Sequence, residues 1–88
     1  MAWVIVERSF EEPVAFQTVQ EREEAVAWCM EVHKVRFVRS FFSTDGRRMV
    51  CLYEAPDAEA VRTANRQSGN PFDRIWTTDI FEPPPEAG

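Results

Sequence analysis

The order of strand and helix patterns is the feature that most restricts how this chain can fold. Near the middle, two strand-like runs flank Asp45-Gly46, a dipeptide typical of the tight turn of a β-hairpin. A helical run lies on each side of this hairpin, and a further strand-like run lies at each end. In chain order, the runs cover residues 2–8, 18–32, 34–42, 48–54, 58–68 and 72–81. The sequence therefore predicts the order β-α-β-β-α-β.

This order predicts an α+β fold of the ferredoxin-like type. Both crossover helices should cover one face of a four-stranded antiparallel sheet, with the first and third strands in its centre. The second helix has clear predicted ends, because Asp57 is a good N-cap and Gly69 a good C-terminal stop. We expect one domain over residues 1–82 and a flexible, proline-rich tail over residues 83–88.

Charge and composition exclude several classes of function. Ten basic against fifteen acidic residues give a net charge of −5, and no basic stripe is present to bind the phosphates of a nucleic acid. No apolar run approaches the roughly 18 residues of a membrane span, and the first residues do not resemble a signal peptide. The two cysteines form no C-x-x-C motif, so the reduced, intracellular state is the default. We therefore expect a cytoplasmic protein that binds neither nucleic acid nor membrane.

The strand patterns are apolar on both faces, which predicts a homodimer. In the first strand Trp3 and Ile5 alternate with Val4 and Val6, so neither face is polar. Helices cover only one face of such a sheet, and an apolar second face needs its own cover. The simplest cover is a second copy packed sheet against sheet about a two-fold axis, as in dimeric α/β barrels. The side chains expected on this uncovered face are Trp3, Ile5, Phe37 and Phe41.

A few polar side chains lie within this apolar surface and form a candidate ligand pocket. Val50 and Leu52 suit the helix-covered core, so we expect Cys51 and Tyr53, on the other face of their strand, to point to the uncovered side. An even-length hairpin loop would place Ser40 opposite Cys51, whereas an odd loop with a bulge at Gly46 would bring Arg39 there. Both registers stay open. The candidate pocket residues are Glu7, Arg39, Ser40, Cys51 and Tyr53.

These residue types also have plainer explanations. Free cysteine is often a small buried hydrophobe, and Glu7 with Arg39 would also make an ordinary structural ion pair. Cys29 and His33, four residues apart, share a helix face and are candidate metal ligands, although the chain has no second histidine. His33 also suits a helix C-terminus, where its positive form complements the helix dipole.

The segment from residue 35 to residue 75 resembles a family of small bacterial proteins of unknown function, described as nickel-responsive, nickel-binding, ferredoxin-like dimers. The resemblance is carried by "RS" before the hairpin, by "CLYEAPDAEAVR" and by "PFDRI", and it extends to the opening "VIVER". It implies the fold, dimerisation and a bound divalent metal. Related sequences carry a histidine beside the matching serine or in the second helix, where this chain has Arg39 and Asn65. The matching positions are Ser40, Cys51 and Tyr53.

Two functional hypotheses follow. The first, implied by the resemblance, is a homodimeric binding protein that takes nickel, another divalent metal or a small ligand; the candidate metal ligands are Cys51, His33 and Cys29. The alternative, by analogy of fold, is a small dimeric α/β-barrel enzyme, monooxygenase-like or isomerase-like, acting on a hydrophobic or aromatic substrate. In that case Arg39 and Glu7 would orient the substrate. The sequence does not decide between the two.

Overall fold

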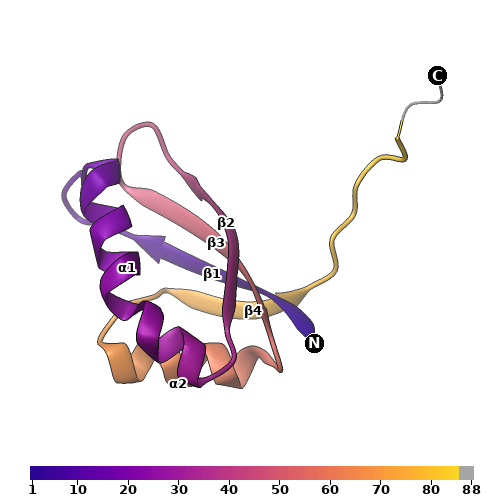
Figure 1. Ribbon diagram of the computed structural model, residues 1–88. Helices are drawn as coiled ribbons and strands as arrows, with labels where there is room; N and C mark the ends of the chain where they lie inside the picture. The colour runs from indigo at the N-terminus through magenta and orange to yellow at the C-terminus, as the bar shows by residue number, and fades with distance from the viewer. Residues whose placement is uncertain (86–88) are drawn as a thin grey trace.

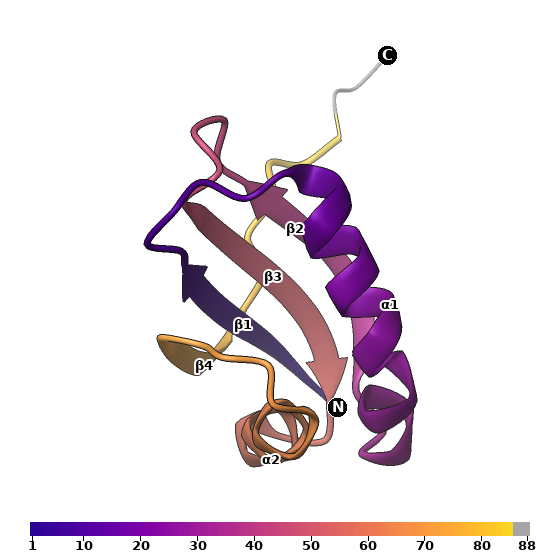
Figure 2. The same ribbon diagram turned by 90° about the vertical axis from the view of Figure 1, so that its left-hand side faces the viewer.

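The computed structural model describes residues 1–85 and contains the predicted elements in the predicted order. The strands form one antiparallel sheet in the order β2-β3-β1-β4, so the first and third strands are central, as expected. Both helices lie on one side of the sheet, which confirms the ferredoxin-like fold (Figures 1 and 2). The elements are β1 (Ala2–Ser9), α1 (Phe16–Val32), β2 (Arg36–Phe42), β3 (Arg48–Ala55), α2 (Ala58–Ser68) and β4 (Arg74–Thr78).

The β2–β3 hairpin closes through residues 44–47, bounded by a hydrogen bond from Ser43 N to the carbonyl oxygen of Arg48 at 2.8 Å. This loop requires glycine at position 46 for two reasons. Gly46 has a φ of +74°, and a Cβ added there would lie 2.7 Å from the carbonyl oxygen of Val14. The close approach ties the hairpin to the segment before α1, where Val14 N donates to the Gly46 carbonyl oxygen at 2.9 Å.

The even-length loop selects one of the two predicted registers. Ser40 lies opposite Cys51 and Arg39 opposite Leu52, so the alternative with Arg39 beside Cys51 is wrong. The irregularity in the ladder lies between Phe37 and Arg39 rather than at the turn.

This irregularity changes which aromatic residues share a face. Phe37 lies opposite Tyr53, with ring centroids 5.7 Å apart, whereas Phe41 lies opposite Val50. The expectation that Phe37 and Phe41 face the same side is therefore wrong. The extra residue of the bulge reverses the alternation between them.

The second helix ends as predicted, but the last strand is shorter than expected. Asp57 accepts a hydrogen bond from Ala60 N at 2.8 Å, and Gly69 adopts the left-handed conformation with a φ of +70°. β4 stops at Thr78 because this residue already pairs with Trp3, close to the start of β1. Neither helix within residues 1–85 has the length and hydrophobicity needed to cross a membrane.

Residues 79–85 contain no helix or strand and run away from the sheet (Figure 1). The predicted tail, residues 83–88, begins within this segment, and residues 86–88 lie outside the described residues. The domain boundary at residue 82 stays a prediction.

The strand register defines the two faces of the sheet, because directly paired residues of antiparallel strands share a face. On the helix-covered side, one row across the sheet consists of Ser40, Cys51, Val6 and Ile75. The opposite side has no helix over it, and we call it the open face. The open face comprises Trp3, Ile5, Glu7, Ser9, Arg36, Arg39, Phe41, Arg48, Val50, Leu52, Glu54, Arg74, Trp76 and Thr78.

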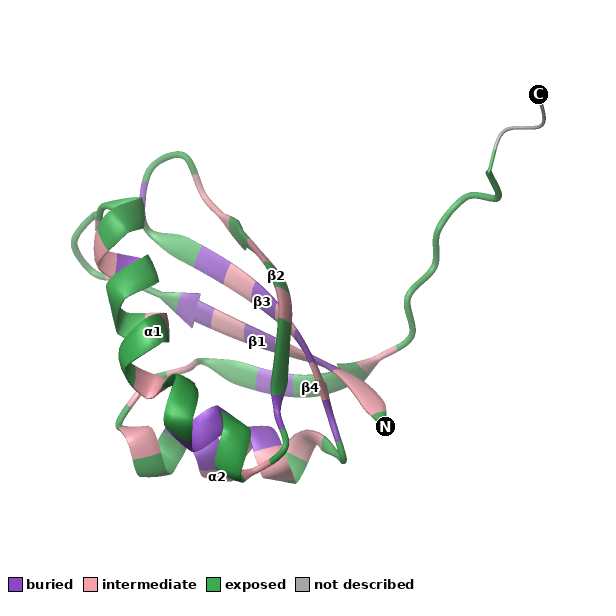
Figure 3. Ribbon diagram, viewed as in Figure 1, coloured by how far each residue is buried: buried purple, intermediate pink, exposed green. Residues whose placement is uncertain are grey.

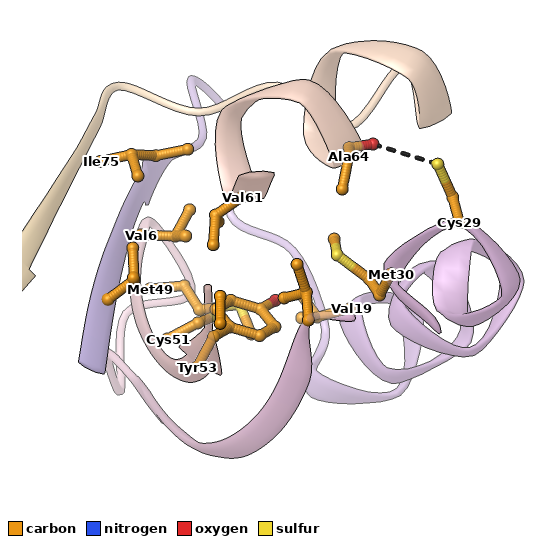
Figure 4. Packing of buried hydrophobic residues seen from close by; sticks show 13 residues of the cluster. Val6, Val19, Cys29, Met30, Met49, Cys51, Tyr53, Val61, Ala64 and Ile75 are labelled. Carbon is orange, nitrogen blue, oxygen red and sulfur yellow. Dashed lines mark hydrogen bonds between the residues drawn. The ribbon is translucent and has the colours of Figure 1, made fainter. Parts of the chain in front are cut away.

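Burial alternates along β1 and β3 in agreement with these faces (Figure 3). Cys51 and Tyr53 are completely buried on the helix-covered side, among core residues from both helices (Figure 4). The expectation that they point to the open side is wrong. Both faces of β3 are mainly apolar, so hydrophobicity did not identify the inner one; pairing with Val4 and Val6 of β1 does.

Candidate functional site

The five residues of the predicted pocket divide between the two sides of the sheet. Glu7 and Arg39 lie on the open face, whereas Ser40, Cys51 and Tyr53 lie on the helix-covered side. The sheet itself separates the two groups, so they do not line one pocket.

A different polar residue, Arg8, occupies the helix-covered side. Strand alternation places it on the same face as Val4 and Val6, and it is only 4% exposed. Sequence reasoning missed Arg8 as a site residue. The signal was nevertheless present, because Arg8 follows Ala2, Val4 and Val6 as the fourth inward position of an otherwise apolar alternation.

The guanidinium of Arg8 is held by groups at the end of α2. Its Nη2 donates to Asn65 Oδ1 at 2.7 Å, and its Nη1 donates to the carbonyl oxygens of Pro71 at 2.5 Å and Asn70 at 3.4 Å. Asn65 is completely buried, and its Nδ2 donates to the carbonyl oxygen of Val61 at 2.7 Å. The amide of Asn65 is thereby fixed with its oxygen toward Arg8.

Glu23 connects α1 to this cluster. The hydroxyl of Tyr53 donates to Glu23 Oε2 at 3.2 Å, and Glu23 Oε1 lies 3.8 Å from Arg8 Nε. The second distance is that of an ion pair, too long for a hydrogen bond. The cluster therefore joins β1, β3, α1 and α2 through one buried cation and one partly exposed carboxylate.

Both titratable core residues beside this cluster are neutral near pH 7. Burial, followed by the nearby negative charge of Glu23, raises the pKa of the Cys51 thiol to about 11. Burial is also the main cause that raises the pKa of Tyr53, with further contributions from Cys51 and Glu23. Cys51 is thus a protonated thiol, which is a poor nucleophile and a poor metal ligand.

A cleft of about 440 Å³ lies beside Arg8, between α1, the end of β1 and the segment after α2. Exposed Arg22 also lines it, so the cleft reaches the surface. Much of the wall is apolar and comes from α1 and the ends of the central strands. The apolar lining residues are Phe10, Val19, Ala25, Val26 and Met49.

Two buried nitrogen atoms at this cleft have no hydrogen-bond partner within residues 1–85. They are Arg8 Nε and Asn70 Nδ2, and both residues line the cleft. Native proteins pair nearly all buried polar groups, because an unmade hydrogen bond costs about 1–3 kcal/mol. Two such donors on residues that line one cleft mark it as the strongest candidate site.

Comparison with protein families gives a match over residues 5–77 to the family described as nickel responsive protein SCO4226-like. The chain belongs to this family. The fold of the SCO4226-like family is also evident in a crystal structure of SCO4226 from Streptomyces coelicolor A3(2), which superposes with a TM-score of 0.81. The two sequences are 18% identical, and the match covers 92% of this chain and 100% of the other, so it establishes the fold. No curated protein matches the sequence.

The name of the SCO4226-like family makes nickel the first metal to consider, but the donors in one subunit do not fit such a site. The Sγ of Cys29 donates to the carbonyl oxygen of Ala64 at 3.4 Å (Figure 4), and His33 Nε2 lies 2.7 Å from Gln67 Oε1. No three side chains of His, Cys, Asp or Glu come together among the described residues. The predicted ligands Cys29, His33 and Cys51 are therefore not assembled into a metal site within the subunit.

Proposed function

We propose that this protein is a small-ligand-binding protein that works as a homodimer. Each subunit binds one ligand in the cleft between α1 and the sheet, and two subunits pair through their open faces. Membership of a family described as nickel responsive agrees with a binding role.

The observation that carries this proposal is a buried guanidinium beside a cleft that reaches the surface. Burying a charge costs several kcal/mol unless the surrounding groups compensate for it. An apolar side chain at position 8 would extend the core of Val4 and Val6 without that cost. Instead, Asn65 and two backbone carbonyl groups hold Arg8 in place, while its Nε–H stays without an acceptor. This arrangement supports recognition of a ligand.

The proposed homodimer rests on the chemistry of the open face. Phe41 is 66% exposed there, and three charged groups of this face, Glu7, Arg36 and Glu54, already have partners. Arg36 Nη2 donates to Glu54 Oε1 at 2.9 Å, and Trp76 Nε1 donates to Glu7 Oε2 at 2.7 Å. A second copy can cover these three groups without leaving them unpaired, which is the condition for burying them, while the exposed Arg39 can keep its charge at the rim of the contact.

We do not propose nickel as the ligand of the cleft. Arg8 and Arg22 both line it, and their positive charges repel a divalent cation. The enzyme alternative also lacks a specific observation in its favour. Its proposed polar anchors, Glu7 and Arg39, lie on the open face, and the thiol of Cys51 is protonated at neutral pH.

A fragment screen followed by nuclear magnetic resonance tests the proposal. The panel contains neutral, cationic and anionic fragments of drug-fragment size, together with nickel chloride. We expect hits to shift the backbone amides of Val26, Met49 and Gly69, three residues around the cleft. The amide of Trp76, on the open face, serves as the control. If no class of fragment shifts the cleft amides at millimolar concentration, the proposal is wrong.

A further inference from the structure

We propose that the ligand of this cleft is a monocarboxylate with a compact apolar body. One carboxylate oxygen accepts a hydrogen bond from Arg8 Nε, and the other accepts one from Asn70 Nδ2. The inference rests on the proposed function, because it assigns a chemical class to the ligand of the same cleft.

The two unpartnered nitrogens belong to two residues that are in contact. Arg8 Nη1 lies 3.4 Å from the carbonyl oxygen of Asn70, which brings the guanidinium and Asn70 together. Both free atoms are donors, so the missing partner must be an acceptor. A carboxylate offers two acceptor oxygens in a fixed fork, and hydrogen bonds from arginine to a carboxylate are among the stronger ones in proteins.

The charge of the lining favours a single negative charge on the ligand. Two arginines, Arg8 and Arg22, and one acidic residue, Glu23, line the cleft and leave it a net charge of +1. The whole chain has a net charge of −5, so this cleft is positive within an acidic protein. A monoanion neutralises the cleft, whereas a cation would add to the uncompensated charge.

The shape of the cleft favours an apolar body attached to the carboxylate. Its volume of about 440 Å³ lies within the range of small-molecule sites, and side chains such as Phe10, Val26 and Met49 line it. Hydrophobic walls with a few directed polar groups are the usual composition of such sites. A bare inorganic anion would leave these walls without contacts.

Glu23 competes with the ligand for Arg8. Arg8 Nε and Asn70 Nδ2 are both covered from solvent, so a carboxylate reaches them only when a neighbouring side chain moves. Glu23 is the candidate, because its side chain is 22% exposed and its Oε1 lies 3.8 Å from Arg8 Nε, too far for a hydrogen bond, while its Oε2 accepts one from Tyr53 at 3.2 Å. Binding thus replaces the carboxylate of Glu23 beside the guanidinium with the carboxylate of the ligand, which accepts a hydrogen bond from Arg8 Nε.

The test compares three probes by calorimetry: 3-phenylpropionate, the isosteric 3-phenylpropionamide and acetate. We expect 3-phenylpropionate to bind at least about tenfold more tightly than either of the others. The amide lacks the charge that strengthens the hydrogen bonds, and acetate lacks the apolar body. In parallel, the side-chain amide signal of Asn70, assigned by its loss in Asn70→Ala, should shift with 3-phenylpropionate. Asn70→Ala removes no side-chain hydrogen bond found within residues 1–85, so this variant should fold.

The same Asn70→Ala variant and three others test which residues the ligand contacts. Asn70→Ala should weaken binding of 3-phenylpropionate by about tenfold, and Glu23→Gln should strengthen it several-fold because the competing charge is gone. Arg22→Gln should weaken binding by about twofold to fivefold. Arg66→Gln is the matched control, since Arg66 is equally exposed on a helix but does not line the cleft, and it should have no effect.

The outcomes separate this inference from the proposed function. If 3-phenylpropionamide and 3-phenylpropionate bind equally tightly and both shift the amide signals of the cleft, the cleft binds ligands but does not recognise a carboxylate. Binding of acetate as tight as that of 3-phenylpropionate would overturn the apolar body. Failure of all three probes and of every fragment class would overturn both proposals, and binding unchanged in Asn70→Ala would refute the assigned contact.

Discussion

Each side of the sheet departs in one respect from the usual arrangement of a small α+β domain. The helix-covered side holds a buried cation, Arg8, together with completely buried Asn65 and the carboxylate of Glu23. The open face, which would normally be polar, is rich in aliphatic and aromatic side chains such as Ile5 and Phe41. Polar groups in a protein interior are costly, and so is an exposed apolar surface. Both features agree with the proposals made above, a ligand on the inner side and a second copy on the outer one.

The largest expected effect is the loss of stability when the buried cation is removed. Arg8→Leu leaves Asn65 Oδ1 and the carbonyl oxygen of Pro71 without their donors, and the carboxylate of Glu23 without its cation. We expect the free energy of unfolding to fall by about 3–5 kcal/mol, as for other broken buried ion pairs.

The matched change on the open face is Arg39→Leu, which should alter the free energy of unfolding by less than about 0.5 kcal/mol because Arg39 is exposed. Urea denaturation of both variants at the same protein concentration makes the measurement. Similar losses in the two variants would contradict the distinction between the two sides.

The fold was predictable because several local signals agree. The Asp45-Gly46 turn, the Asp57 cap and the Gly69 stop all lie where the structure has them, and the order of elements then determines the sheet. Family membership, inferred from the "CLYEAP" region and its surroundings, is confirmed over residues 5–77.

The facing of the strands was not predictable from hydrophobicity. Val50 and Leu52 are more apolar than Cys51 and Tyr53, yet the latter pair is buried. The inner face is decided by pairing with β1 and by Glu23, which supplies an acceptor for the hydroxyl of Tyr53 from a distant helix. Such a long-range partner leaves no local pattern in the sequence.

The second expected effect is a loss of stability at alkaline pH, which originates on the helix-covered side. Burial raises the pKa of Cys51 from 9.0 in the unfolded chain to about 11 in the folded protein. The folded state therefore retains a proton that the unfolded state loses, so the related stability is present below pH 9 and disappears as pH approaches 11. A difference of about two pH units corresponds to about 3 kcal/mol. Tyr53, with its pKa also raised, contributes in the same direction at higher pH.

Chemical denaturation from pH 7 to pH 11 measures this dependence. Cys51→Ala should lower stability at every pH but flatten the decline between pH 9 and pH 11. Cys29→Ala is a useful second comparison, because Cys29 is equally buried but lies on α1 and contacts the carbonyl oxygen of Ala64 in α2. An identical alkaline decline in wild type and Cys51→Ala would assign the effect to other groups.

The smallest change in the stability of the subunit itself is expected from Ile5→Lys, although this change should have a large effect on association. Ile5 lies on the open face between Leu52 and Trp76 and is only partly buried within the subunit. A lysine there keeps its stem on the sheet and its charge in solvent, so the free energy of unfolding of one subunit should change by less than about 1 kcal/mol. In a dimer paired through the open faces, the same lysine would bring a charge without a partner into an apolar contact and prevent pairing. Sedimentation velocity at micromolar concentration should therefore give a dimer for wild type and a monomer for Ile5→Lys.

Gln17→Lys is the control for this measurement. It makes an equal change of charge on the exposed surface of α1 and should stay dimeric. A wild-type protein that is monomeric and stably folded under these conditions would remove the partner proposed for the open face and leave its apolar side chains without an explanation.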